Sequence, residues 1–286
     1  MKDIKILECV FKSHAEIYEN IIYPVSAGAE LYNENDTVLP MRDNTGENIS
    51  EKNPCYCELT VQYWAWKNLE CDICGIFHQR RFLDFSGINE KYPYRIAGQS
   101  DEMILRKAGL SYEKICELSD KYSIIANRRE NLYEGIEDFY NRNDRQNFDD
   151  MGLLKDIIRE IYPAYFPSAE KYFKSTLSYF CNIFIMDKTN FDKYSEWLFA
   201  ILFEYEKRKP KNLFYPREMG KLGERLFGVY MTYVMDHTDI SWTEFPRLHF
   251  SGVNGATLKN WSFNRFFYYI CPPGTRRRAF VRKLKK

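Results

Sequence analysis

Asp72-Ile73-Cys74-Gly75-Ile76-Phe77 is the stretch that decides the fold. A near-continuous apolar run of this length is typical of a strand buried on both faces of a parallel sheet. Further short apolar runs predict strands within residues 4–11, 122–126 and 181–186. Helical patterns alternate with these runs and cover residues 56–68, 150–161, 168–180, 189–209 and 219–235. This alternation indicates an α/β fold with a mostly parallel sheet flanked by helices. We expect one domain over residues 1–270 and a basic tail over 271–286.

Composition and charge exclude several classes of protein. The chain has 286 residues, 45% of them hydrophobic, which is enough for a large buried core and excludes disorder as the main state. Its formal net charge is +1, but seven basic residues and no acidic one follow from Arg276 onward, so the tail carries +7 and the body −6. An acidic body argues against nucleic-acid binding. Because we find neither an 18-residue apolar run nor a secretory leader, we expect a cytoplasmic protein.

The eight cysteines do not predict a disulfide framework in a chain of this kind. Cys55-x-Cys57 and Cys71-x-x-Cys74 have a spacing that zinc sites also use. However, Cys55 and Cys57 fall at the start of a predicted helix, where positions two apart point to different faces, and Cys74 falls in the predicted strand. We therefore interpret the cysteines as reduced thiols that serve as small buried side chains.

His78, Arg80 and Arg81 follow the central strand directly. Ligands of open α/β sheets bind at the carboxyl ends of strands, and paired guanidinium groups suit a diphosphate. The alternative is that Arg80 and Arg81 pair with Asp84 or Glu90 on the surface and that His78 is an ordinary hydrogen-bonded histidine. Spacing alone does not decide between the two interpretations.

Two further stretches contain candidate polar groups. Residues 46–53 form a polar loop that includes Asn48 and leads into Asn53-Pro54, which predicts a helix with an Asn N-cap and Pro in its first turn. Glu224 and Arg225 lie next to Gly223 on an otherwise apolar helix, so a carboxylate there is a candidate general base. Turn formation and helix-surface ion pairing are the alternatives.

Several long blocks of the chain resemble one family. They include Asn53-Pro54-x-Tyr56-x-Glu58-Leu59-Thr60, Tyr63-Trp64-Ala65-Trp66-Lys67-Asn68 and Gly75-Ile76-Phe77-His78-x-Arg80-Arg81-Phe82. Asn182-Ile183-Phe184-Ile185-Met186, the block around Glu196-Trp197-Leu198 and Gly223-Glu224-Arg225-Leu226 follow in the same order. Over residues 4–235 the chain closely resembles bacterial capsule and exopolysaccharide glycosyltransferases, long catalogued as a domain of unknown function.

The resemblance implies a fold of the GT-A kind and transfer of a sugar from a UDP-sugar to a growing, lipid-linked saccharide in capsule, exopolysaccharide or lipopolysaccharide synthesis. Galactose and galactofuranose are the associated donors, and inversion is expected by analogy. His78, Arg80 and Arg81 stand where many GT-A enzymes place Asp-x-Asp, so dependence on Mn²⁺ or Mg²⁺ stays open. The chain departs from the family at Lys12-Ser13-His14 and at Asn147.

The resemblance also suggests roles for individual residues. Glu224 or Asp187 is expected to deprotonate the acceptor hydroxyl. The remaining candidates fall into two groups, one for the donor and its diphosphate (His78, Arg80, Arg81, Phe11, His14, Asn48, Tyr56 and Tyr63) and one for the acceptor or sugar (Trp64, Asn182, Trp197 and Arg225). For the aromatic members, packing in the core is the alternative.

Aromatic residues precede the cations of the tail, from Trp261 and Phe263 to Phe266, Phe267, Tyr268 and Tyr269. This order suits the headgroup layer of an anionic leaflet and predicts a peripheral enzyme at the inner face of the plasma membrane. A solvated C-terminus is the alternative. A non-catalytic nucleotide-sugar or protein-binding component of a polysaccharide assembly complex is the alternative function.

Overall fold

The computed structural model describes residues 1–11, 20–32, 39, 41–88, 91–99, 102–143, 149–252 and 266–284. The strands are β1 Ile4–Val10, β2 Ile22–Ser26, β3 Met41–Arg42, β4 Ile73–His78, β5 Arg81–Leu83, β6 Tyr94–Gln99, β7 Ile124–Asn127, β8 Glu130–Asn131, β9 Leu177–Ser178, β10 Phe184–Asp187, β11 Trp242–Phe245 and β12 Arg247–Gly252. Seven of them form the main path of a ten-stranded sheet in the order β11-β7-β10-β4-β1-β2-β3.

Only β10 runs against the other strands of this path. β4, β1, β2 and β3 pair in parallel, as do β7 and β11, whereas β10 pairs antiparallel with both β4 and β7. The prediction of a mostly parallel α/β sheet is therefore confirmed. The short antiparallel strand β5 continues directly from β4 and carries the sheet on to β12 and β6.

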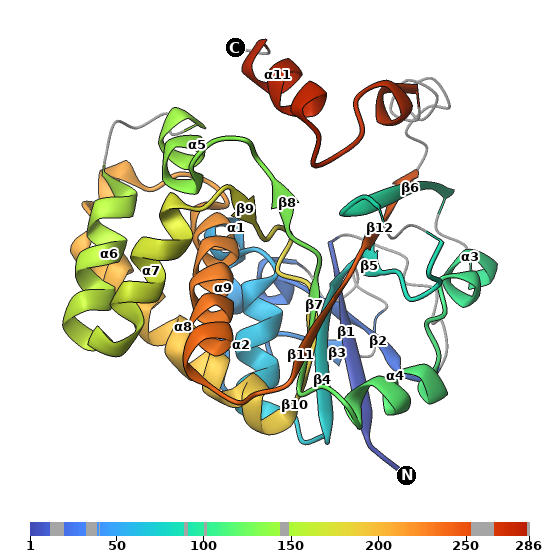
Figure 1. The fold of residues 1–286 in the computed structure, drawn as a ribbon. Helices are drawn as coiled ribbons and strands as arrows, with labels where there is room; N and C mark the ends of the chain where they lie inside the picture. The colour runs from blue at the N-terminus through green and yellow to red at the C-terminus, as the bar shows by residue number, and fades with distance from the viewer. Residues whose placement is uncertain are drawn as a thin grey trace.

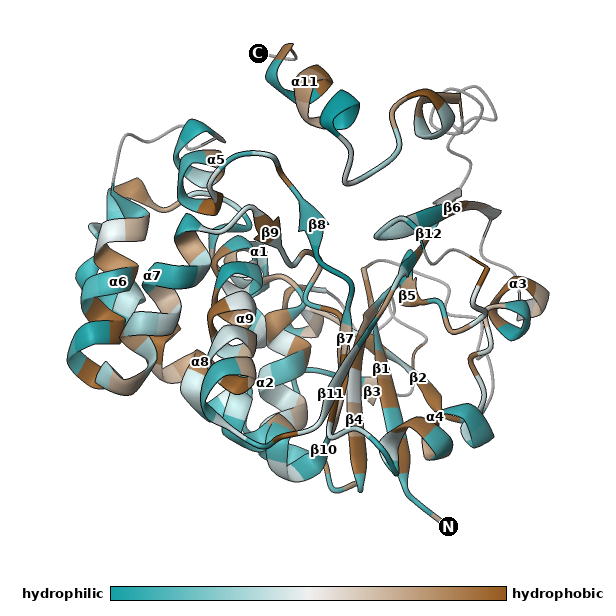
Figure 2. Cartoon of the chain, in the orientation of Figure 1, coloured by the Kyte–Doolittle hydropathy of each residue, from teal (hydrophilic) through white to brown (hydrophobic). Residues whose placement is uncertain are grey.

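Helices cover both faces of the sheet (Figure 1). They are η1 Ala29–Leu31, η3 Ser50–Lys52, α1 Asn53–Tyr56, α2 Leu59–Asn68, α3 Glu102–Lys107, α4 Tyr112–Ser119, α5 Ile136–Asn143, α6 Asp150–Ile161, η4 Pro163–Tyr165, α7 Phe166–Lys174, α8 Lys188–Arg208, η5 Lys211–Leu213, α9 Glu218–His237 and α11 Arg276–Leu284. Each face of the sheet has its own apolar cluster because side chains alternate along a strand: Leu7 and Cys9 belong to one, Ile4 and Ile6 to the other. Figure 2 shows the strands as the most hydrophobic layer.

The helix predicted from Asn53 onward is broken after one turn. Cys57 has a φ of 53°, which few non-glycine residues adopt, and α2 begins only at Leu59. Asn53 is not an N-cap as predicted, since it lies inside α1 and its Nδ2 donates to the Cys57 carbonyl and to Thr60 Oγ1, at 2.9 and 3.1 Å. The break brings Cys57 and Glu58 to the lining of a cavity.

A fully buried ionic cluster joins the long helices. The Lys209 Nζ lies 2.6 Å from Asp150 Oδ1 and also contacts Glu218, and all three side chains have no exposed surface. Tyr205 donates to Glu218 Oε1 at 2.7 Å. Because a buried charge is tolerated only when it is paired, this cluster fixes where α6, α8 and α9 meet.

The C-terminal helix α11 packs against the body of the molecule. Arg278 donates to the Tyr94 hydroxyl at 2.8 Å, and Arg282 lies 3.0 Å from Glu130. Arg278 and Arg282 are therefore not part of a solvated chain end, which was the alternative considered from the sequence. Within the described ranges, no helix has the length and apolar character that crossing a bilayer requires.

Candidate active site

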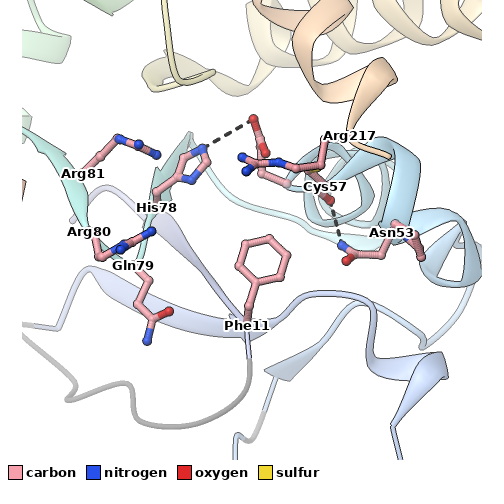
Figure 3. Close-up of a pocket in the computed structure, with 10 residues that line it drawn as sticks. Phe11, Asn53, Cys57, His78, Gln79, Arg80, Arg81 and Arg217 are labelled. Carbon is pink, nitrogen blue, oxygen red and sulfur yellow. Dashed lines mark hydrogen bonds and ion pairs between the residues drawn. The ribbon is translucent and has the colours of Figure 1, made fainter. Parts of the chain in front are cut away.

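A cavity of about 480 Å³ opens where β1 and β4 end. Because the two strands are parallel and Cys9 is in register with His78, the residues that follow them emerge at the same edge of the sheet. The described residues that line the cavity are Phe11, Asn53, Pro54, Cys57, Glu58, His78, Gln79, Arg80, Arg81 and Arg217 (Figure 3). The structure thus brings together four of the residues predicted to bind the donor: Phe11, His78, Arg80 and Arg81.

Three guanidinium groups border this cavity. Arg80 and Arg81 lie on one side and Arg217 approaches from the other (Figure 3). Among the described residues neither Arg80 nor Arg81 forms an ion pair. Of their two alternative partners, Asp84 is bound to Arg95 and Glu90 lies outside the described residues. Arg217 is held by its left-handed backbone (φ 68°) and by a 2.9 Å hydrogen bond from its N–H to the Pro54 carbonyl. The cavity rim is therefore a site of concentrated positive charge.

A buried carboxylate and imidazole lie behind the arginines. The His78 Nε2 is 3.4 Å from Glu58 Oε1, and the two residues are 9% and 4% exposed. Asn182 Nδ2 donates to the same Glu58 oxygen at 2.6 Å and to the Gly220 carbonyl at 3.1 Å. Burial raises the pKa of Glu58, but His78 and the Asn182 hydrogen bond outweigh burial, so the pKa lies below its ordinary value. Glu58 is therefore ionised and orients the imidazole.

Glu224 does not line this cavity. Its Oε1 accepts the Cys181 N–H at 2.6 Å, and its Oε2 accepts from Arg225 at 2.8 Å. Arg225 is buried and also donates to Ser178 Oγ at 2.6 Å. Both oxygens of Glu224 are thus engaged in holding the turn before β10, which agrees with the ion-pair alternative rather than with a free base.

Asp187 lies at the opposite edge of the sheet. Because β10 is antiparallel to β4, Asp187 is in register with Ile73, the first residue of β4, while His78 is the last. Its carboxylate caps α8 by accepting the Asn190 N–H at 2.9 Å. The structure therefore does not bring Asp187 to the cavity.

The predicted aromatic contacts are mostly core packing. Tyr56 donates to Glu206 at 3.0 Å, Tyr63 to Glu47 at 2.7 Å and the Trp64 indole to Thr45 at 2.8 Å. All three rings are buried in the main hydrophobic cluster, as is Trp197, and none lines this cavity. The alternative interpretation of packing in the core therefore holds at this site.

The remaining candidates are placed as follows. Asn48 stabilises its own loop, with Oδ1 accepting the Ser50 N–H at 3.1 Å, and it does not line the cavity. Asn182 reaches the site indirectly, through Glu58. His14 and Asn147 lie outside the described residues.

Sequence reasoning missed Glu58 and Arg217 as site residues. A signal for Glu58 was present: it lies directly before the apolar Leu59 in a predicted helix rich in aromatic residues, and an acidic side chain that is buried needs a partner. Arg217 gave no comparable signal, since its position depends on a left-handed turn. The cysteine pairs lie apart, with Cys57 at the cavity and Cys74 in β4 near the opposite edge.

Comparison with known proteins places this geometry in a family. Residues 5–236 match a family described as a domain of unknown function (DUF4422). The chain belongs to this family. The DUF4422 match includes every described residue that lines the cavity and ends before α11.

One solved structure is closely similar, the apo structure of the WbbM bifunctional glycosyltransferase. It is 30% identical in sequence, with a TM-score of 0.80 over 87% of this chain. The chain spans 46% of the length of that protein. No curated protein matches the chain.

Proposed function

We propose that this protein is a glycosyltransferase that moves a sugar from a UDP-sugar to a saccharide acceptor. The observation that supports the proposal best is the cavity at the carboxyl edge of the sheet, where three arginines surround a buried Glu58–His78 pair. The similarity to the WbbM bifunctional glycosyltransferase supports the same reaction class.

Arg80, Arg81 and Arg217 are proposed to bind the diphosphate. Sugar transfer separates a nucleoside diphosphate from the sugar, and the negative charge that develops on the leaving oxygen must be stabilised. Guanidinium groups donate two parallel hydrogen bonds to phosphate oxygens and remain charged at any physiological pH. Phe11 lines the same cavity and offers a ring for the base or the sugar.

His78 is proposed as the group that takes the proton from the acceptor hydroxyl. The ionised Glu58 holds the imidazole in place and stabilises the imidazolium that forms, in the way a carboxylate orients a catalytic histidine elsewhere. Asn182 acts only by positioning Glu58. This assignment replaces Glu224 and Asp187, whose carboxylates are engaged elsewhere.

The described lining does not fit a divalent cation well. Mg²⁺ and Mn²⁺ prefer carboxylate oxygens, and Glu58 is the single carboxylate among the described lining residues. Glu58 is already bound by His78 and Asn182. We therefore derive no step through a metal and expect the arginines to supply the positive charge.

The finer features rest on the family resemblance. We propose galactose or galactofuranose as the sugar, a lipid-linked saccharide as the acceptor, an inverting outcome, and a role in capsule, exopolysaccharide or lipopolysaccharide synthesis. The fold is proposed to be of the GT-A kind.

The outer surface of α11 and residues 266–270 supports a location at the inner face of the plasma membrane. Phe266, Tyr269, Phe280 and Leu284 are each more than 60% exposed. Arg276, Arg277 and Lys283 are exposed on the same helix, whereas Arg278 and Arg282 face the body. Apolar and basic side chains side by side suit an anionic headgroup layer.

Turnover of UDP-galactose with a saccharide acceptor tests the reaction. We expect Arg80→Ala and Arg81→Ala each to lower kcat/KM by roughly 100-fold, the usual cost of losing one donor to a developing oxyanion. Arg159→Ala is the matched control, since Arg159 is exposed on α6, where its guanidinium pairs with Asp156 and lies over the Phe166 ring, away from the cavity. Binding of UDP without turnover by the parent would favour the non-catalytic alternative instead.

A further inference from the structure

A second cavity, of about 360 Å³, lies between η4, α8 and α9. Five aromatic residues line it: Tyr162, Tyr165, Trp197, Tyr230 and Tyr233. None of its residues lines the first cavity. It lies toward the edge of the sheet opposite to the first cavity. Asp187, in register with the first residue of β4, directly precedes α8, and the lining residue Ile240 leads into the start of β11 (Figure 1).

Three rings of this aromatic cavity lie at small angles to Tyr165, whereas Tyr162 meets Tyr165 edge-on at 75°. Tyr165 stacks on Tyr233 with centroids 3.8 Å apart and an interplanar angle of 23°. Trp197 lies 5.0 Å from Tyr165 at 32°, and Tyr230 lies 6.1 Å from it at 19°. Tyr162, Tyr165 and Tyr233 keep part of their surface exposed, so accessible aromatic surface lines the cavity.

The polar groups around these rings have unused hydrogen-bonding capacity. Trp197 is 3% exposed, and its Nε1–H has no partner among the described residues. An unsatisfied buried donor of this kind costs about 1–3 kcal/mol. Lys193 and Glu196 line the same cavity one helical turn apart. Neither forms a hydrogen bond or ion pair with another described residue, although burial and, to a smaller extent, the nearby Glu196 raise the pKa of Tyr162. A ligand with many hydroxyls would satisfy all three.

We propose that the aromatic cavity binds a saccharide, as a site separate from the cavity at His78. The C–H face of a pyranose packs on aromatic rings, while its hydroxyls accept from Trp197 and Lys193 and donate to Glu196. The volume lies within the range of about 300–1,000 Å³ found for small-molecule sites. The choice of a saccharide among polyhydroxyl ligands rests on the proposed function. In that setting the site holds a distal part of the acceptor or product chain.

Binding to an array of defined oligosaccharides, followed by saturation-transfer NMR on the bound ones, tests this proposal with the full chain. The parent is expected to bind at least one oligosaccharide, and Tyr233→Ala is expected to weaken that binding at least tenfold. Trp197→Phe keeps an aromatic ring at this position and removes the indole donor together with the five-membered part of the ring, and Glu196→Gln changes an exposed group. Both are expected to weaken binding by several-fold without unfolding the protein.

Two controls separate this site from the proposed active site. Tyr269→Ala removes an aromatic side chain that is 66% exposed in another part of the chain, and it should leave saccharide binding unchanged. Arg80→Ala should lose turnover and keep saccharide binding at the aromatic cavity. The proposal is overturned if the parent binds no oligosaccharide, or if Tyr233→Ala and Trp197→Phe both bind as the parent does. Full turnover by Arg80→Ala would instead contradict the proposed active site alone.

Discussion

At the residue scale, the chemistry depends on Glu58 being buried and still ionised. His78 and Asn182 both approach its Oε1, at 3.4 and 2.6 Å, and together they hold its pKa below the ordinary value despite burial. Glu58 acts through His78, so we regard it as a positioning residue. A change at Glu58 should therefore affect the chemical step more than the binding of the donor.

Glu58→Gln keeps an oxygen for Asn182 and removes the charge. We expect kcat to fall at least tenfold while KM for the UDP-sugar changes little, which steady-state kinetics of the purified protein will measure. His78→Asn should act in the same way. A large rise in KM with unchanged kcat would contradict the positioning role.

The effect of Glu58→Gln on the stability of the folded protein is expected to depend on pH. A carboxylate whose folded pKa is depressed stabilises the folded state above its unfolded pKa, 4.5, and loses this effect as pH falls through the lower folded value. The stability difference between parent and Glu58→Gln should shrink as pH falls from about 5 toward 3. Thermal unfolding across this range measures it, and a difference that grows toward acid pH would contradict the account.

Glu8 presents the opposite case on β1. It is 2% exposed, its Oε2 has no partner among the described residues, and burial raises its pKa to about 8. The folded chain therefore binds this proton more tightly than the unfolded chain, so stability falls as pH rises from about 4.5 to 8. At pH 8.5, Glu8→Gln should be more stable than the parent by a few kcal/mol, since each pKa unit corresponds to roughly 1.4 kcal/mol. It should therefore unfold at a higher temperature than the parent. Equal stability of the two proteins at pH 8.5 would refute this.

At the element scale, the buried Lys209 cluster decides how three helices meet. Asp150 lies 59 residues from Lys209 in the sequence and Glu218 nine, and none of the three has exposed side-chain surface. Removing one partner leaves uncompensated charge in the interior, which costs more than the pair contributes. The cluster is thus a point where a single substitution affects α6, α8 and α9 together.

Lys209→Met should lower the free energy of unfolding by about 3–5 kcal/mol, as measured by urea denaturation. Lys207→Met is the matched control two residues away, because Lys207 is 74% exposed and its ion pair within the described part of the chain is with Glu204 on the surface. Its expected effect is under 1 kcal/mol. A similar loss in both variants would show that the cluster does not carry this stability.

The sequence predicted the positions of helices and strands better than it predicted the direction of a strand or a break in a helix. β1, β4, β7 and α6 lie where apolar periodicity placed them, because burial depends directly on the side chains involved. The apolar run around β10 carries no information on strand direction, and its antiparallel pairing is what removes Asp187 from the site. The break at Cys57 was missed because a positive φ at a non-glycine residue depends on tertiary contacts.

At the scale of the whole molecule, α11 lies beyond the carboxyl ends of β1 and β4 (Figure 1), the edge of the sheet at which the first cavity opens. Arg278 of α11 bonds Tyr94, whose ring stacks on His249 at 4.2 Å, and His249 is in register with the cavity residue Arg81. If the protein docks on a membrane through α11, its first cavity would lie near the membrane surface that carries the proposed lipid-linked acceptor. The sequence predicted the basic tail but not its contacts with the body.

Charge reversal tests this docking without removing the contacts of α11 with the body. Arg277→Glu combined with Lys283→Glu should lower binding to phosphatidylglycerol-containing vesicles at least tenfold in a sedimentation assay, since each cation contributes about 1 kcal/mol near an anionic surface. Lys121→Glu with Lys174→Glu is the matched control, as Lys121, just after α4, and Lys174, at the end of α7, are 58% and 76% exposed. Equal binding of the tail variant and the parent would exclude α11 as the docking surface.

The central claim is that the arginines at the carboxyl edge of β4 bind the diphosphate of an activated sugar. A crystal structure of the protein with UDP tests it most directly. We predict both phosphates within hydrogen-bonding distance of Arg80 and Arg81, with the uridine inside the cavity beside Phe11. UDP bound elsewhere, with Arg80 and Arg81 turned toward solvent, would contradict the account.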